Sequence, residues 1–421
     1  MYIVPAYISI EKDEIGNLCL FSTLEGTEIA LEEAKYITEF WTIYNNGTEK
    51  IDTELTRFLH KYNMLIEKDK LSDTVKSVIE EVESGFFKVT IMPTEQCNFR
   101  CTYCYEQFKY GIIDDCVVNR IMEFIKHKLK YENHTEFKLE WFGGEPTLSR
   151  QGLIPSVTSS MKSLCEHSSI KFTSSITTNG YLLSRSLFLD YLHSGITNFQ
   201  ITIDGLRHDL TRIACDGSGT FSTIINNIKD IHDLSNDYKY NVTLRYNVLP
   251  ENQDTSWYDY LGNLVKDDDR FGILIRPVSD LGGEKVKYLE RYSAKDWKEL
   301  LNFHIQKALA AGLKVVNLSE KRPFAKACFA SFKDSYIFRA NGDVVKCSSH
   351  IDDDRNIIGI VDPQKGVIIN EQKNAIWSSF LPGKECYDCS DLGSCLNKNC
   401  PYLRLEHNAC IYCEKAQVYC Q

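Results

Sequence analysis

The chain has 421 residues, more than one hydrophobic core usually serves, so we expect two or three domains. A net charge of −10 with scattered lysines and arginines excludes the basic surface of a nucleic-acid binder. No apolar stretch approaches the roughly 20 residues of a membrane helix, and no export signal stands at the amino terminus, so we expect a cytoplasmic protein with no membrane partner.

Residues 1–70 are predicted to form a small α+β module that is winged-helix-like. The alternating segments YISIEK and LCLFST predict a hairpin around Asp13–Asn17. The segments ALEEAKYITEFWTIY and TELTRFLHKYNMLI follow with helical period. A charged helical linker at 71–85 separates this module from the next domain.

Residues 86–312 alternate strands with helices, and this pattern predicts an α/β fold with parallel strands and right-handed crossovers. Functional residues are then expected in the loops at the carboxyl ends of the strands. The expected strands are FKVTIMP, EFKLEWF, IKFTSSITT, NFQITID, YNVTLRYNVL and FGILIRPV, with helices near 114–131, 153–166, 183–194, 221–235, 256–267 and 294–312.

Sixteen cysteines in a reducing compartment indicate metal ligation or redox chemistry rather than disulfides. Directly after the first strand of this domain, TEQCNFRCTYCYE places Cys97, Cys101 and Cys104 in one loop. A structural zinc site would use four protein ligands, whereas three thiolates leave a metal with an open coordination position. An incomplete zinc knuckle is the alternative.

Later strands of the same domain also end in polar or glycine-rich loops. The second strand is followed by GGEP, the third by TNG, and the fourth runs into ITIDG. Glycines permit close backbone approach, and the planar guanidinium of Arg212, eight residues after Asp204, suits bidentate recognition of a carboxylate. A simple glycine-rich turn and a surface arginine are the alternatives.

Together these segments resemble the radical S-adenosylmethionine (SAM) superfamily, whose CxxxCxΦC signature is met in full, with Tyr103 as the aromatic residue. The resemblance implies a partial (β/α)6 TIM-like barrel in which Cys97, Cys101 and Cys104 hold a [4Fe–4S] cluster whose fourth iron binds SAM. It implies that Tyr103 lines the adenine site, that Glu145 takes the SAM ammonium group and that Arg212 pairs with the SAM carboxylate. The remaining SAM-binding residues that it implies are Gly143, Gly144, Pro146, Thr178, Asn179, Asp204 and Thr202, which stands where Ser is common.

Residues 313–421 contain nine of the cysteines, and their spacing resembles the SPASM domain, which holds two auxiliary [4Fe–4S] clusters. The resemblance implies that the first cluster is bound by Cys328, Cys347 and Cys400, and the second by Cys386, Cys389, Cys395 and Cys413. Cys410 and Cys420 compete with Cys413 for the last position. One gap departs from the pattern, because four residues instead of three separate Cys395 from Cys400. A pair of zinc ribbons is the alternative.

SPASM-bearing members of the superfamily act mostly on peptides, and residues 1–70 resemble the leader-recognition (RRE) domain of peptide-modifying enzymes. We therefore expect a maturase that joins a Cys of a ribosomally made precursor peptide to an α or β carbon through a thioether. Its partners would be that precursor with its leader and a reducing donor such as flavodoxin or ferredoxin. Carbon–carbon crosslinking is the closest alternative. Formylglycine formation, with Asp254, Asp259 or Asp280 as base, comes next, and a non-enzymatic electron carrier or zinc scaffold is a different class.

Overall fold

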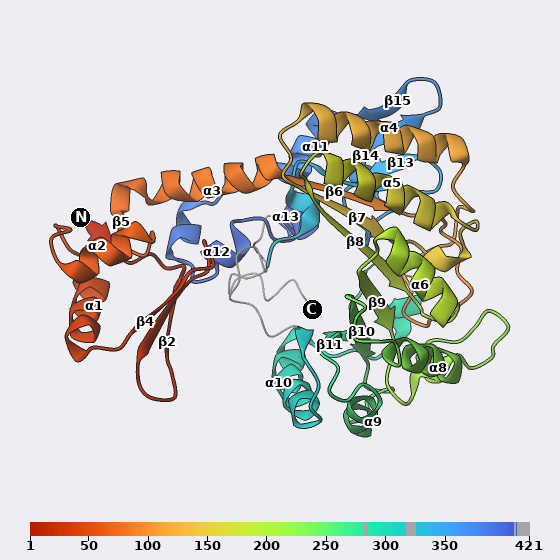
Figure 1. The fold of residues 1–421 in the computed structure, drawn as a ribbon, viewed down its shortest axis with the longest axis horizontal. Helices are drawn as coiled ribbons and strands as arrows, with labels where there is room; N and C mark the ends of the chain where they lie inside the picture. Colours follow the sequence, from red (N-terminus) through yellow and green to blue (C-terminus); the bar gives the residue numbers. More distant parts are fainter. Residues whose placement is uncertain (282–284, 317–325, 408–409, 411–421) are drawn as a thin grey trace. The chain divides into compact units, whose positions relative to one another are not determined.

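The computed structural model describes residues 1–281, 285–316, 326–407 and 410. The chain divides into two compact units, which are described separately. The first unit comprises residues 1–84 with the described parts of 319–333 and 375–420. The second comprises 85–318, where described, and 334–374 (Figure 1).

The second unit is built on a ten-stranded sheet of order β11-β10-β9-β8-β7-β6-β12-β13-β14-β15. The six strands from β6 to β11 are all parallel and alternate with helices, which confirms the predicted α/β class and is consistent with a partial barrel. The strands are β6 (Phe86–Ile91), β7 (Glu136–Trp141), β8 (Lys171–Thr178), β9 (Asn198–Thr202), β10 (Asn241–Val248) and β11 (Phe271–Pro277). The helices are α4 (Asp115–Tyr131), α5 (Leu153–His167), α6 (Arg185–Ser194), α7 (His208–Thr211), α8 (Phe221–His232), α9 (Ser256–Leu264) and α10 (Ala294–Ala310).

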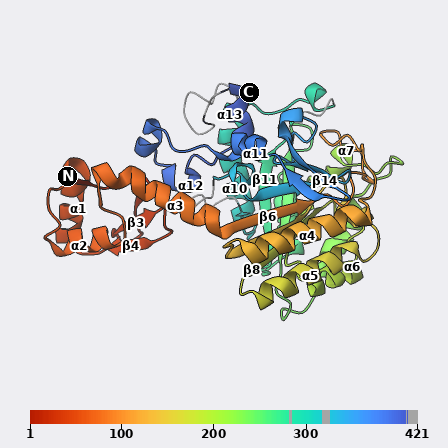
Figure 2. The ribbon, with the colours of Figure 1, turned by 90° about the horizontal axis from the view of Figure 1, so that it is seen from above.

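The two faces of the parallel strands differ in chemistry because side chains alternate along a strand. One face is apolar and packs against helices that lie on one side of the sheet, such as α4, α5 and α6 in Figure 2. Trp141 belongs to this face and donates its indole N–H to Thr158 Oγ1 of α5 at 3.0 Å. The opposite face carries polar side chains that the strand register places on the same side, and parts of this face are only partly buried. They are Thr90, Glu140, Thr177 and Gln200. This polar face is called the inner face below.

Four further strands extend the sheet beyond β6, where the sequence led us to expect loops. They are β12 (Ser335–Phe338), β13 (Asp343–Val345), β14 (Ile357–Asp362) and β15 (Gly366–Ile369). β12 pairs in parallel with β6, and the following three pair antiparallel as a meander. All four residues of β12 are buried, so its short sequence lacks the alternation that identifies a strand.

The amino-terminal part of the first unit contains a three-stranded antiparallel sheet of order β2-β3-β4, a two-stranded sheet of order β1-β5 and three helices. A capping box between Thr53 and Thr56 begins α2, since each side chain serves the other's backbone N–H. The elements of residues 1–85 are β1 (Tyr2–Ile3), β2 (Ile8–Lys12), β3 (Leu18–Ser22), β4 (Glu28–Leu31), α1 (Ala34–Asn46), α2 (Glu54–Lys61), β5 (Ile66–Glu67) and α3 (Leu71–Gly85).

The same unit includes short helices from the cysteine-rich end of the chain. Leu392 and Leu396, at α12 (Leu392–Cys395), belong to one buried cluster with Leu20, Phe40 and Leu59 of the amino-terminal module. The Lys398 ammonium is buried and contacts Glu83 at 2.6 Å and the Ser378 carbonyl at 2.9 Å. The first 84 residues and the cysteine-rich segment therefore share one core.

Among the described helices, none combines the length and the apolar character needed to cross a membrane.

Candidate active site

The loop that follows β6 carries the three expected cluster ligands. Its backbone is paired with the segment after α7: the Arg100 N–H donates to the Ile213 carbonyl and the Thr102 N–H to the Thr211 carbonyl, both at 2.9 Å. Phe99, between the first two cysteines, is fully buried. The loop is therefore held by backbone hydrogen bonds and by an aromatic anchor, before any metal is considered.

The three thiols lie in surroundings that favour a bound cation. Burial, the Glu145 carboxylate and the other two cysteines together raise the pKa of Cys97 to about 12. Burial likewise raises the pKa of Cys104 to about 12. A positively charged metal centre reverses this penalty because it binds thiolates directly. The Phe99 N–H, 3.4 Å from Cys97 Sγ, is available to a thiolate ligand at that position.

The glycines of GGEP allow the loop after β7 to touch the backbone of the cysteine loop. A Cβ atom at Gly144 would collide with the carbonyl oxygens of Glu95 and Gln96, and one at Gly143, whose φ is 119°, would collide with the Thr94 carbonyl. Only glycine permits this close approach. Pro146, which is buried, then begins a 3₁₀ turn, Pro146–Leu148.

The Glu145 carboxylate joins the GGEP and TNG loops. It is fully buried and accepts hydrogen bonds from Thr178 Oγ1 and the Asn179 N–H, both at 2.6 Å, and from Thr147 Oγ1 at 2.7 Å. Asn179 in turn donates to Asn98 Oδ1 at 2.8 Å in the cysteine loop. Glu145 thus holds the GGEP and TNG loops together through hydrogen bonds. Its contact with a SAM ammonium group stays a prediction.

Tyr103 links the cysteine loop to the ITIDG loop. Its hydroxyl donates to Asp204 Oδ2 at 2.6 Å and accepts from Arg212 Nη1 and Asn247 Nδ2, both at 3.0 Å. Thr211 Oγ1 adds a 2.8 Å bond to Asp204. Asn247, at the carboxyl end of β10, and Thr211 were not expected from the sequence. Thr202 lies at the end of β9, two residues before Asp204.

Arg212 lies beside this loop and has one unused hydrogen-bond donor. It is 8% exposed, and its Nε is buried with no hydrogen-bond partner among the described residues. Its guanidinium lies 5.7 Å from the Phe99 ring. An unused buried N–H beside three thiols fits the carboxylate of a cofactor such as SAM. The predicted SAM-loop residues are therefore brought together and have the donors that the group would use.

Glu106 is a further buried group that the sequence analysis missed. Both of its carboxylate oxygens lack a hydrogen-bond partner among the described residues. Burial raises the pKa of Glu106 to about 8, and the nearby Glu95 carboxylate adds to the rise. In the sequence, the only indication that Glu106 belongs to this site is its position two residues after Cys104.

The carboxyl-terminal cysteines fall in both units. Cys347 belongs to the second unit, while Cys328, Cys386, Cys389, Cys395, Cys400 and Cys410 belong to the first. Burial raises the pKa of Cys395 to about 11, and the neighbouring Cys410 raises the pKa of both Cys395 and Cys386. Cys386, Cys395 and Cys410 are therefore neighbours. Cys413 and Cys420 lie outside the described residues, so the choice among the last ligands stays a prediction.

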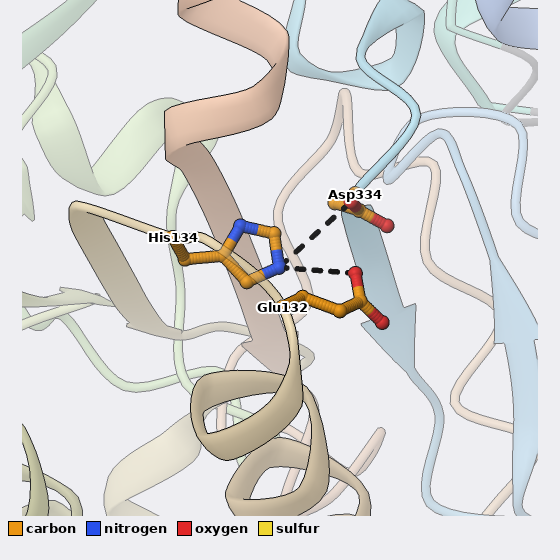
Figure 3. A group of neighbouring side chains, drawn as sticks. All are labelled: Glu132, His134 and Asp334. Carbon is orange, nitrogen blue, oxygen red and sulfur yellow. Dashed lines mark ion pairs between the residues drawn. The ribbon is translucent and has the colours of Figure 1, made fainter.

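A second group of possible metal ligands lies at the opposite end of the strands. His134 directs Nε2 at carboxylate oxygens of Glu132, 3.3 Å away, and Asp334, 3.9 Å away (Figure 3). However, the Lys128 ammonium lies 2.8 Å from Glu132 Oε1 and 2.9 Å from Asp334 Oδ1. This lysine already supplies the positive charge, so we interpret the group as an ion-pair cluster that joins α4 to β12.

Residues 91–261 match the Radical SAM superfamily model. A curated GTP 3',8-cyclase of Haemophilus influenzae is 26% identical over 129 residues, which is 31% of this chain and 36% of that protein. The chain spans about a third to a half of the length of the GTP 3',8-cyclases that it matches.

Two solved structures share the fold. Native anSMEcpe with bound AdoMet and Cp18Cys peptide has a TM-score of 0.53 and 21% identity, over 73% of this chain and 87% of that one. Streptococcus suis SuiB bound to precursor peptide SuiA has a TM-score of 0.51 and 14% identity, over 97% of both chains.

The fold and the site define an α/β sheet domain, consistent with a partial barrel, with three thiols and an arginine with an unused buried N–H at the carboxyl ends of its strands. The part of the chain that builds this site is the part that matches the Radical SAM superfamily model.

Proposed function

We propose that this protein is a radical SAM maturase that crosslinks a Cys-containing precursor peptide, most simply by a thioether to an α or β carbon. The observation that carries the proposal is the joining of the cysteine loop, Glu145 and Arg212 into one buried network with an unused Arg212 Nε. An electron carrier or zinc scaffold has no need of such an anion-binding arginine.

The residues that would hold the cofactors are those of the network. Cys97, Cys101 and Cys104 would bind a [4Fe–4S] cluster, and Arg212 would pair with the SAM carboxylate. When bound, the cluster and SAM would supply one-electron radical chemistry at a carbon of the peptide. Tyr103 fixes Arg212 against Asp204, while the buried Phe99 ring and the close approach of Gly144 hold the cysteine loop in place.

The peptide class is supported by two proteins of similar fold whose structures contain bound peptides, Cp18Cys in anSMEcpe and SuiA in SuiB. We further propose that residues 1–70 capture a leader peptide. β2 and β4 are the edges of the three-stranded sheet within the described residues, so an extended segment could add a strand to either. The cysteine-rich segments would hold the two auxiliary clusters, and flavodoxin or ferredoxin would supply electrons.

Anaerobic reconstitution with iron and sulfide, followed by dithionite and SAM, tests the enzyme class. We expect 5′-deoxyadenosine by chromatography, and none from the Cys101→Ala variant. A protein that retains zinc, or that does not cleave SAM, would contradict the proposal.

The crosslink is tested with the peptide encoded by a short neighbouring reading frame. A thioether predicts the loss of two hydrogens together with a thiol that no longer reacts with iodoacetamide. If two hydrogens are lost while every thiol still reacts, the product is a carbon–carbon crosslink.

A further inference from the structure

The inner face of the barrel sheet carries two arginines that the network described above does not use. Arg245 lies on β10 and Arg276 on β11, and the register places Arg245 opposite Leu274 and Asn247 opposite Arg276. Residues two apart on a strand, and their registered partners, point to the same face. Arg245 and Arg276 are therefore diagonal neighbours on the adjacent strands β10 and β11.

Arg245 is directly connected to the candidate active site. Its Nε donates to Asn247 Oδ1 at 2.8 Å, and Asn247 holds the Tyr103 hydroxyl at 3.0 Å. Tyr103 and Tyr105 of the cysteine loop are close enough to influence the charge of Arg245. The arginine pair is thus adjacent to the place where the proposed chemistry occurs.

Neither guanidinium forms an ion pair with a described residue. Among the described residues, no carboxylate oxygen lies within 4.0 Å of the nitrogens of Arg245 or Arg276. Other charges on this face are compensated, because Lys88 lies 2.6 Å from Glu140 and Asp204 is held by Tyr103 and Thr211. Burial and the Arg276 charge lower the pKa of Arg245, whereas Tyr103, Tyr105 and the Asp204 carboxylate act to raise it. Two neighbouring guanidinium groups with no paired carboxylate among the described residues form an incomplete ion site.

We propose that Arg245 and Arg276 bind a carboxylate of the substrate peptide, either an acidic side chain or the carboxyl terminus. This inference rests on the proposed peptide substrate and adds that the peptide is anionic where it enters the barrel. The nitrogens of Arg276 make no hydrogen bond to a described residue, and the Arg245 fork uses only Nε, so both retain donors for a bidentate oxyanion. Such a contact positions the neighbouring residue of the peptide against the cysteine loop.

A phosphate presents the same oxyanion chemistry, and curated relatives named GTP 3',8-cyclase make a nucleotide the obvious second source. The experiment therefore measures the binding of GTP as well as the binding of acidic peptides, so that a phosphate and a peptide carboxylate can be distinguished.

The test uses full-length, anaerobically reconstituted protein with SAM. It is immobilised and equilibrated with a synthetic library of nine-residue peptides that contain one Cys and random residues elsewhere. One library has free carboxyl termini and a second has amidated termini, and bound peptides are identified by mass spectrometry. Because the protein has a net charge of −10, non-specific attraction would enrich basic peptides.

We expect about tenfold enrichment of peptides with Asp, Glu or a free carboxyl terminus near the Cys, the size expected of a charge-assisted pair. Arg245→Gln and Arg276→Gln should abolish it, whereas Lys298→Gln on the exposed surface of α10 should not. Arg276 is exposed at the strand edge, so its variant should fold normally.

Three results would overturn the inference. If SAM is cleaved but acidic peptides are not enriched, the carboxylate site is wrong while the enzyme class stands. If GTP binds through the two arginines and acidic peptides do not, the site recognises phosphate instead. If neither the wild-type protein nor its arginine variants cleave SAM, the proposed function fails and this inference fails with it.

Discussion

The Tyr103 hydroxyl forms hydrogen bonds with three buried side chains. They are Asp204 on the loop after β9, Arg212 directly after α7 and Asn247 on β10. Replacing Tyr103 by Phe keeps the ring but leaves Asp204 and Arg212 without this link. We expect the free energy of unfolding to fall by about 1–3 kcal/mol, measured by urea denaturation. Tyr131→Phe, on the surface at 65% exposure, is the matched control and should change nothing. Equal stabilities for the two variants would contradict the network.

His304 predicts a specific pH dependence of stability. It is fully buried beside the Tyr258 hydroxyl, 2.7 Å from its Nδ1, and burial lowers the pKa of His304 to about 4. An unfolded histidine titrates near 6.5, so between about pH 6.5 and pH 4 the unfolded chain binds a proton that the folded chain does not. The folded protein is thus most stable above this window. Its free energy of unfolding falls by about 3 kcal/mol as the pH falls through the window.

The measurement compares melting temperatures from pH 7 to pH 4 with those of a Tyr258→Phe, His304→Leu double variant. The variant should lose less stability across the window. Parallel curves for the two proteins would show that His304 is not the group that titrates.

Gly144 is the residue at which a single methyl group should affect the metal centre. Because its Cβ would collide with the backbone of the cysteine loop, Gly144→Ala must move that loop. We expect the variant to hold less iron and sulfide per chain after reconstitution. Gly111→Ala, where a Cβ meets no atom within 4 Å, should incorporate iron normally. Normal iron content in both would indicate that the loop can adjust.

At the scale of elements, Lys398 joins the cysteine-rich segment to the end of α3. Its side chain is 1% exposed, and replacing it by Met leaves Glu83 and two carbonyl oxygens without their donor. Breaking a buried pair in this way costs about 3–5 kcal/mol. We expect Lys398→Met to melt at a lower temperature in circular dichroism, while the exposed Lys76→Met on α3 does not. Retained stability in Lys398→Met would show that water replaces the ammonium.

The elements that the sequence predicted best are the six parallel strands and their helices. Their strands are long and hydrophobic and their helices amphipathic, so the two periods are easily distinguished. β4 was missed because its residues were read as the start of α1. β12 was missed because four consecutive buried residues show no alternation, and its pairing with β6 joins segments more than 240 residues apart.

At the scale of the whole molecule, the candidate site was predictable where its chemistry is local. The cysteine spacing and GGEP are continuous in sequence, so they identified their loops. Asn247 and Arg245 could not be found in this way, because a single polar residue in a strand gives no signal until the register places it beside Tyr103 or Arg276. Glu145 shows the opposite case, since its position was predicted but its four protein hydrogen bonds were not.

The proposed number of clusters gives a prediction for the whole chain. With one SAM-binding and two auxiliary [4Fe–4S] clusters, reconstituted protein should hold about twelve irons. A variant with Ala at positions 97, 101 and 104 should lose about four of these and keep the remainder. Colorimetric iron analysis distinguishes this from a chain with one cluster, in which the same variant would retain almost no iron.

The core shared by the first 84 residues and Leu392 and Leu396 has a consequence for synthesis in the cell. A ribosome adds roughly 5–20 residues per second, so the amino-terminal module waits for tens of seconds before its last packing partner emerges. During that interval the apolar side chains that later cover Leu392 are open to water or to a chaperone. The core of the first unit is therefore complete only after the cysteine-rich segment has been synthesised. Nascent chains whose synthesis ends before this segment should be the ones that aggregate.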